Sequence, residues 1–311
     1  MKPPRLWKKR RLARRLLALF ILALAFRFIS RELQGVEAHE VWHQLRQISP
    51  QRLLLIFCLV AIDYGILSHY DGMTLRYLKQ ELPWSKSRLG SFLSYCFNFN
   101  FGSLVGGIGF RFRVYMLWGL EAPVVTQLLL FSLLTNWLGH FTLSALIFLS
   151  APTAADRLGV PVSILQTWGA LSGTLVASYI LLSLMGRREF KLWRWRWPIP
   201  NKRLVGLQIL CSCTHWLLVS SVIYTIWTAY APETSYFSIL STHLSSAVLG
   251  AITQVPGGIG ILEAVFVKSF SDSMDKATVV ASLLCFRLVY YFIPLLFALL
   301  LYGRLEWHQE D

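Results

Sequence analysis

Residues 124–150 read VVTQLLLFSLLTNWLGHFTLSALIFLS, without a single Asp, Glu, Lys or Arg. An apolar helix of about 20 residues crosses the hydrocarbon core of a bilayer, so this stretch is long enough to span one. Similar runs occupy Leu53–Tyr70, Ser163–Met185, Leu204–Ala229 and Val279–Tyr302. The sequence therefore predicts an all-α integral membrane protein.

The composition of the whole chain agrees with this prediction. Of its 311 residues 55% are hydrophobic and 15% are charged, and the mean hydropathy is +0.51. These values lie outside the usual range of water-soluble domains. The formal net charge is +14, but the basic residues gather beside the apolar runs, as they do in the cytoplasmic loops of membrane proteins. We therefore expect membrane phospholipids as partners, and no nucleic acid.

A sixth apolar run, Leu16–Ile29, follows an N-terminal arm rich in Lys and Arg. This pattern also resembles a cleavable secretory signal, with small residues at Ala23 and Ala25. Cleavage there would cut inside the apolar run, so we favour a retained short span whose flanking Arg side chains reach the two interfaces. With it the protein has six spanning helices.

The distribution of basic residues sets the expected topology. The N-terminal arm and the segment 187–203 each carry a cluster of Lys and Arg, which places both in the cytoplasm. Four spans already connect these clusters, so the segment Leu89–Phe110 has to return to the side from which it enters. A re-entrant hairpin fits its Asn and Gly content, because irregular backbone at membrane depth needs polar surroundings. Both chain termini are then expected in the cytoplasm.

The tetrapeptide Gly106-Gly107-Ile108-Gly109 recurs as Gly257-Gly258-Ile259-Gly260, 151 residues later. The same displacement carries the spans of the first half onto those of the second. We therefore predict one transmembrane domain, 1–311, with repeat halves of about 12–150 and 163–302 and re-entrant hairpins at about 89–110 and 239–270. Three crossings per half make the repeat inverted, and inverted repeats with glycine-broken helices are typical of transporters. The alternative is that these glycines only let helices pack closely.

Six polar or charged residues lie where the bilayer core is expected: Asp63, Arg111, Arg113, Asn136, Glu263 and Arg287. A charge at the centre of a spanning helix costs roughly 2.5–3.5 kcal/mol, so each charged residue needs a partner or a watery cavity. Arg287 aligns with Asn136 under the 151-residue displacement. The two equivalent spans thus each present one polar group at the same depth.

Several of these residues also have a plainer interpretation. Glu263 follows the second glycine motif, where its carboxylate can cap the first turn of a half-helix, pair with Arg287 or exchange a proton. Arg111 can be a cytoplasmic anchor at the end of an apolar run. Asp71 closes a span and is expected to act as an interfacial cap.

No metal or cofactor is expected. The five cysteines lie inside apolar segments, where a thiol behaves as a small hydrophobic group. Histidines in helical apolar settings are expected to make packing hydrogen bonds rather than to relay protons, and they are His140, His215 and His243. The chain contains no Walker motif, so ATP hydrolysis would have to come from another protein.

Four blocks carry a family resemblance: residues 105–111, VGGIGFR; 135–139, TNWLG; 256–266, PGGIGILEAVF; and 286–294, FRLVYYFIP. They resemble the YbhN inner-membrane proteins, which are similar to the transmembrane region of lysylphosphatidylglycerol synthases. The resemblance covers essentially the whole chain and implies a bacterial inner-membrane protein of the flippase-like type. It carries over four functional candidates: Arg111, Asn136, Glu263 and Arg287. Those synthases add a large soluble aminoacyl-transferase domain, whereas this chain stops nine residues after Tyr302, so we do not expect an enzyme.

The leading hypothesis is a translocase or lipid-binding transporter for anionic phospholipids. The lipid phosphate would be bound by the hairpin glycines and the polar candidates: Gly106, Gly107, Gly257, Gly258, Arg111, Asn136, Glu263 and Arg287. A second hypothesis is a membrane scaffold or regulatory subunit that binds a lipid-synthesising enzyme. A third is proton-coupled export of a small polar solute, with Asp63 or Glu263 as the titrating group.

Overall fold

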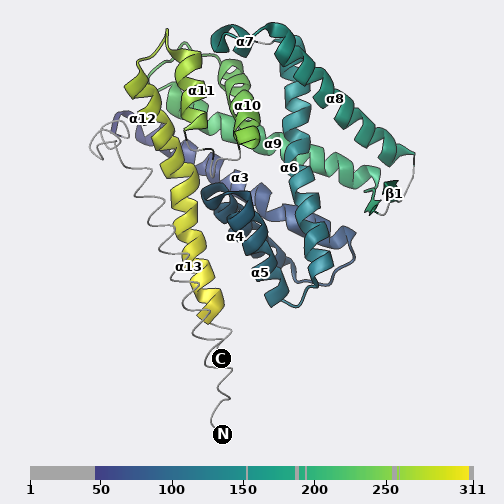
Figure 1. Ribbon diagram of the computed structural model, residues 1–311. Coiled ribbons are helices and arrows are strands. Elements are labelled where there is room, and N and C mark those ends of the chain that lie inside the picture. Colours follow the sequence, from purple (N-terminus) through teal and green to yellow (C-terminus); the bar gives the residue numbers. More distant parts are fainter. Residues whose placement is uncertain are drawn as a thin grey trace.

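The computed structural model describes residues 46–151, 153–185, 189–192, 195–253, 258 and 260–307. Within these ranges the chain is mostly helical, and Figure 1 shows the helices gathered into one bundle. In chain order the elements are α3 (Pro50–Tyr77), α4 (Trp84–Gly102), the π-helix η1 (Ser103–Gly109), α5 (Phe110–Leu117), α6 (Ala122–Ser150), α7 (Thr153–Leu158), α8 (Val162–Leu184), β1 (Glu189–Leu192), β2 (Trp195–Pro198), α9 (Lys202–Trp227), α10 (Tyr236–Thr253), α11 (Ile261–Phe270), α12 (Lys276–Arg287), the π-helix η3 (Leu288–Phe292) and α13 (Ile293–Trp307).

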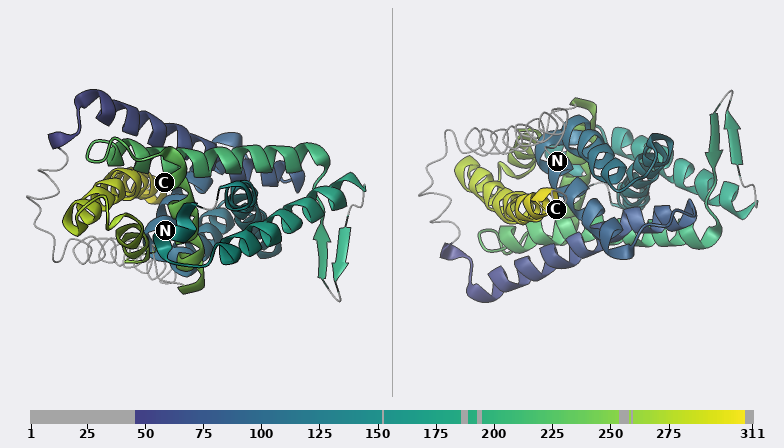
Figure 2. Two further views of the ribbon diagram at one scale, coloured as in Figure 1. Left: turned by 90° about the horizontal axis from the view of Figure 1, so that it is seen from above. Right: turned by 90° about the horizontal axis from the view of Figure 1, so that it is seen from below.

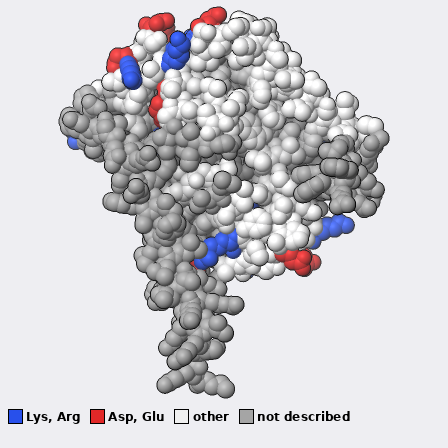
Figure 3. Space-filling model, viewed as in Figure 1, with Lys and Arg blue, Asp and Glu red and all other residues white. Residues whose placement is uncertain are grey.

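Five helical stretches of the described chain are long and apolar enough to cross a membrane. They are α3, α6, α8, α9 and the continuous stretch α12–η3–α13, Lys276–Glu306. These coincide with five of the six expected spans, and the expected span Leu16–Ile29 lies outside the described residues. Leu146 on α6 and Leu175 on α8 are more than half exposed, which suits contact with lipid. In Figure 3 the charged side chains of the described surface lie mostly towards its upper and lower ends, with a broad uncharged belt between them.

The helices α3 and α9 lie side by side along one flank of the bundle (Figure 2). Each helix is preceded by a residue whose side chain caps its first turn. The Ser49 hydroxyl accepts a hydrogen bond from the N–H of Arg52, and the Asn201 carbonyl oxygen accepts one from the N–H of Leu204. Pro50 at the first position of α3 fits the fixed φ of proline. These local signals fix where the two spans begin.

The backbones of α6 and α9 approach closely at Gly139. A Cβ at Gly139 would lie 2.3 Å from the carbonyl carbon of Ser212. The Gly139 N–H donates to Ser212 Oγ at 2.8 Å, and Ser212 Oγ in turn donates to the Asn136 carbonyl at 2.8 Å. Trp216 Nε1 donates to the same carbonyl at 2.9 Å. We call this contact the α6–α9 seam, and it requires glycine at position 139 because a side chain would force the two helices apart.

The chain reverses direction between α4 and α5. The rings of Phe97 in α4 and Phe110 in α5 are stacked with centroids 3.9 Å apart, so the two arms of the turn face each other. A Cβ at Gly106 would lie 2.0 Å from the Phe97 carbonyl oxygen, and one at Gly107 would lie 2.5 Å from Oδ1 of Asn98. Close packing of the two arms therefore accounts for glycine at both positions.

A second change of direction lies between α10 and α11, which pack on each other. Gly258 has a φ of 62° and Gly260, just before α11, a φ of 78°. Both angles fall in the left-handed region, where a residue with a Cβ is disfavoured. Gly257 lies outside the described residues. In Figure 1 the α4–α5 turn occupies the lower half of the bundle, whereas α10 and α11 occupy the upper half.

One element departs from the all-α expectation. Between α8 and α9 the strands β1 and β2 form an antiparallel ribbon, in which Glu189 lies opposite Pro198 and Leu192 opposite Trp195. The alternation of Trp and Arg from Trp195 to Trp197 has the period of two that is typical of a strand. The departure is confined to this connection, so the spans themselves remain helical.

Candidate functional site

Arg287 and Glu263 form an ion pair at the turn between α10 and α11. Arg287 Nε donates to Glu263 Oε1 at 2.7 Å, and Arg287 Nη2 donates to Glu263 Oε2 at 3.1 Å. Nη2 also lies 3.3 Å from the Gly258 carbonyl oxygen, to which it donates. The Gly260 N–H donates to Glu263 Oε2 at 2.9 Å. One carboxylate therefore caps α11 and neutralises Arg287, so two of the roles considered for Glu263 are filled at once.

Burial makes this pair costly to break. The Arg287 side chain is 1% exposed and that of Glu263 is 15% exposed. Removing one partner of a buried pair leaves the other charge without compensation, which typically costs about 3–5 kcal/mol. The pair thus holds the turn at Gly258 and Gly260 against the end of α12.

Arg111 forms a second buried ion pair, with Asp71 of α3. Arg111 Nε donates to Asp71 Oδ2 at 3.1 Å, and the Tyr115 hydroxyl donates to the same oxygen at 2.7 Å. Ser132 Oγ donates to Asp71 Oδ1 at 2.6 Å. Both members of the pair are buried. Arg111 is therefore buried and paired with a carboxylate. The expectation that Asp71 is an interfacial cap is wrong, because its carboxylate bonds to residues of α5 and α6 inside the bundle.

A half-exposed arginine of the same segment ties the turn to the C-terminal helix. Arg113 Nη2 donates to Glu306 Oε1 at 2.7 Å, and Arg113 Nε donates to the Tyr302 hydroxyl at 2.7 Å. The Arg113 side chain is 24% exposed and that of Glu306 is 16% exposed. This pair fastens α5 to α13 near the lower end of the bundle in Figure 1.

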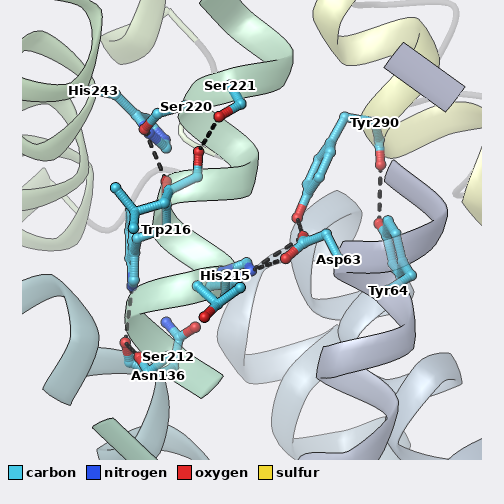
Figure 4. A network of polar contacts seen from close by, with 12 residues as sticks. Asp63, Tyr64, Asn136, Ser212, His215, Trp216, Ser220, Ser221, His243 and Tyr290 are labelled. Carbon is cyan, nitrogen blue, oxygen red and sulfur yellow. Dashed lines mark hydrogen bonds and ion pairs between the residues drawn. The ribbon is translucent and has the colours of Figure 1, made fainter. Parts of the chain in front are cut away.

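Asp63 lies in a third cluster, fully buried in the middle of α3. His215 Nδ1 of α9 lies 2.9 and 3.1 Å from the two carboxylate oxygens, and the Tyr290 hydroxyl of η3 donates to Oδ2 (Figure 4). The Tyr64 hydroxyl donates to the Tyr290 carbonyl at 3.0 Å. His215 thus makes a buried hydrogen bond between helices, as the sequence predicts, and its partner is a carboxylate. The 151-residue displacement aligns Asp63 with Thr214, the residue just before His215, so the repeat alignment indicates the turn of α9 that contacts Asp63.

Asn136 lies on α6 beside the α6–α9 seam (Figure 4). Its carbonyl accepts the two seam hydrogen bonds, and its side-chain Oδ1 is buried without a hydrogen bond among the described residues. Asn136 and Arg287 align in sequence but belong to different contacts. The polar residues expected at one substrate centre thus make separate contacts: Arg287 pairs with Glu263, Arg111 pairs with Asp71, and Asn136 lies at the α6–α9 seam.

A groove of about 850 Å³ lies between α6, α8 and the end of α10. Its lining is almost wholly apolar and comprises Leu130, Phe131, Leu133, Leu134, Trp137, Phe141, Trp168, Tyr179, Leu182, Ile199, Val248, Ala251 and Ile252. Trp137 follows Asn136 directly, so the groove begins next to the α6–α9 seam. The sequence pattern did not single out this groove, because its lining comes from three separate helices.

The spans, the uncharged belt and the ion pairs inside the bundle define a multi-pass membrane protein whose interior charges are paired. We identified no group of His, Cys, Asp and Glu suited to hold a metal among the described residues. The chain belongs to the family of the lysylphosphatidylglycerol synthase TM region, which matches residues 15–298.

Three relatives illustrate this membership. Inner membrane protein YbhN of Escherichia coli (strain K12) is 32% identical over 300 residues, which cover 95% of this chain and 93% of that protein. A protein of Synechocystis sp. is 29% identical over 290 residues, covering 93% of this chain and 89% of that protein. Phosphatidylglycerol lysyltransferase of Staphylococcus aureus (strain MW2) is 26% identical over 291 residues, covering 91% of this chain and 33% of that enzyme. The resemblance seen in the sequence is confirmed, and its shared part is the membrane region.

Proposed function

We propose that this protein moves anionic phospholipids between the two leaflets of the bacterial inner membrane. The observation that carries the proposal is the turn before α11. There the buried Arg287–Glu263 pair adjoins the left-handed Gly258 and Gly260, and no described atom lies within 4 Å of where a Cβ would project from either glycine. A guanidinium that contacts the backbone of a left-handed glycine suits a phosphate group, which arginine binds through two parallel hydrogen bonds.

In this proposal the protein has six spans, beginning with Leu16–Ile29, and both termini lie in the cytoplasm. The α4–α5 turn is a re-entrant hairpin that enters from the cytoplasm, and the α10–α11 turn is one that enters from the opposite side. The two hairpins belong to the halves 12–150 and 163–302 of an inverted repeat. The location of the two turns in opposite halves of the bundle supports this arrangement (Figure 1).

Each of the two turns lies beside one paired arginine, Arg111 in α5 and Arg287 at the end of α12, and a lipid phosphate can replace the carboxylate of that pair. Arg111 is paired with Asp71 and Arg287 with Glu263, so neither guanidinium is left charged and unpaired in the apolar interior. A lipid phosphate that replaces the carboxylate keeps the arginine paired, which avoids the cost of an isolated buried charge. Arg111 Nη2, buried and without a hydrogen bond among the described residues, supplies one more donor. The protein would then have two sites at which a lipid phosphate replaces a carboxylate, one at Arg111 and one at Arg287, and each site would serve one leaflet.

The groove between α6, α8 and α10 supports a lipid as the substrate. Its apolar lining suits an acyl chain, which can stay in contact with the membrane belt while the headgroup passes through the protein. The names of the lysyltransferase relatives indicate phosphatidylglycerol as their lipid. Because the similarity is to their TM region and covers 33% of their length, we propose lipid movement for this chain and not lysyl transfer.

The test uses purified protein in liposomes that contain fluorescent phosphatidylglycerol, with a membrane-impermeant quencher to report the outer leaflet. We expect protein-dependent exchange between leaflets that Arg287→Gln reduces at least tenfold. The matched control is Arg113→Gln, which removes an arginine–glutamate pair of the same 2.7 Å length outside the two proposed sites and should retain most of the exchange. Lack of lipid exchange with any gradient would overturn the proposal and favour a scaffold for a lipid-synthesising enzyme.

A further inference from the structure

Asp63 is a carboxylate in the middle of a membrane span, and its only ion-pair partner among the described residues is a histidine. Both groups are buried. The Tyr290 hydroxyl donates to the same carboxylate, and Phe99 stacks on the His215 ring with centroids 6.3 Å apart. A histidine changes its charge near neutral pH, whereas the arginines that neutralise Asp71 and Glu263 remain charged. Of the three buried acids, Asp63 is therefore the one whose partner can gain or lose a proton.

The titratable groups around Asp63 come from several helices. His215 of α9 and Tyr290 of η3 contact its carboxylate, and Tyr64 and Tyr70 of α3 interact with its charge. Farther out, Cys96 of α4 lies beside Tyr64, Cys211 of α9 beside Tyr70, and Tyr291 beside Tyr290. His243 and His140 lie beyond Trp216, whose ring centroid is 5.3 and 4.9 Å from theirs. No Lys or Arg of the described chain pairs with Asp63. The charge of the cluster therefore depends on the protons that it binds.

The proton count follows from these groups. With one proton shared between Asp63 and His215 beyond the neutral imidazole, the cluster is electrically neutral. Without that proton it carries one uncompensated negative charge in the apolar interior, which is unfavourable. We propose that Asp63, His215 and Tyr290 form a proton-binding site, in which uptake and release of one proton drive the lipid movement proposed above.

The link between this site and the lipid site is the helix that carries Tyr290. Tyr290 lies in the π-helical stretch η3, which continues α12 directly after Arg287. The bond from Tyr290 to Asp63 and the pair of Arg287 with Glu263 therefore hold neighbouring turns of one helix. Short π-helical stretches occur often at functional sites and are less regular than α-helix. Protonation of Asp63 weakens the bond to Tyr290, so η3 can shift and move Arg287 at the α10–α11 turn.

The first part of the test measures the proton directly and needs no lipid transport. Infrared difference spectra of the reconstituted protein, recorded at decreasing pH, should show a carboxyl band that changes as the cluster takes up its proton. Asp63→Asn should abolish this band. Tyr290→Phe should retain it, because Asp63 and His215 remain to bind the proton. His140→Gln, which alters a buried histidine without a carboxylate partner, should leave it unchanged, and thermal stability shows whether each variant is folded.

The second part couples the proton to lipid exchange in liposomes with an imposed pH gradient. We expect the gradient to speed wild-type exchange at least threefold and to have no effect on Asp63→Asn. Absence of a titrating band that depends on Asp63 overturns the proton site, whatever the transport result. If the Asp63-dependent band is present but the pH gradient does not change the rate of lipid exchange, the coupling between proton binding and lipid exchange is overturned. A band in a protein that exchanges no lipid retains the proton site and overturns only the function proposed above.

Discussion

The two arginine–glutamate pairs of this protein allow the effect of burial to be measured with distance held constant. In both pairs the N···O distance is 2.7 Å, but Arg287 is 1% exposed whereas Arg113 is 24% exposed. Glu263→Gln leaves the Arg287 charge in the apolar interior while retaining an oxygen that can cap α11. We expect a loss of about 3 kcal/mol or more in the free energy of unfolding. Glu306→Gln should cost at most about 1 kcal/mol, because water can solvate Arg113.

The assay is the free energy of unfolding in lipid nanodiscs, measured for Glu263→Gln, Glu306→Gln, Arg287→Gln and the double variant Arg287→Gln with Glu263→Gln. The double variant carries no uncompensated charge, so it should regain at least half of the stability lost in Glu263→Gln. Equal losses in Glu263→Gln and Glu306→Gln would refute the reasoning. So would a double variant that is as unstable as the sum of its single changes.

Three further predictions follow from the turns. Gly258→Ala places a Cβ at a φ of 62°, so it should lower the stability of the fold by about 1–2 kcal/mol and abolish lipid exchange. The control Gly250→Ala, in α10 with open space around it, should raise the stability by up to about 1 kcal/mol. Thermal melting of both variants measures these changes. Gly106→Ala should reduce the yield of folded protein, measured by gel filtration, because its Cβ would lie 2.0 Å from the Phe97 carbonyl oxygen. A cysteine at Trp118 should react with an impermeant maleimide only from the cytoplasmic side, and labelling from outside would contradict a re-entrant α4–α5 hairpin.

The spans were the most predictable part of the structure. An uncharged run such as Val124–Ser150 satisfies its own backbone hydrogen bonds as a helix, so its structure depends little on distant residues. The cap formed by Glu263 was equally local, since Glu263 lies three residues after Gly260, the glycine that precedes α11. The cap and the pairing with Arg287 were two of the three alternatives that the sequence left open.

The partners of Asp71 and Asp63 were not foreseen, because they come from other helices. Asp71 meets Arg111 and Ser132 only after α4 and α5 fold back against α3 and α6. Asp63 meets His215 across the α3–α9 contact, 152 residues away in sequence. A polar residue in an apolar run shows that a partner is needed, but helix packing decides which residue provides it.

The two glycine tetrapeptides show another limit of sequence comparison. Gly106 and Gly107 are surrounded by backbone and side-chain atoms of α4, whereas Gly258 and Gly260 have no described atom near the Cβ position. Identical residues therefore serve close packing in one turn and left-handed backbone in the other. Only the helices that surround a motif distinguish these requirements.

The α6–α9 seam restricts how this protein can change shape. The helix α6 belongs to the first proposed repeat half and α9 to the second, yet at Gly139 their backbones are too close to slide without collision. In the transport cycle proposed above, the two halves are therefore not the two bodies that rock against each other. We expect the boundary between moving parts to run through each half, with α6 and α9 in a common stationary frame and the two turns, together with α12–η3–α13, as the parts that move against it.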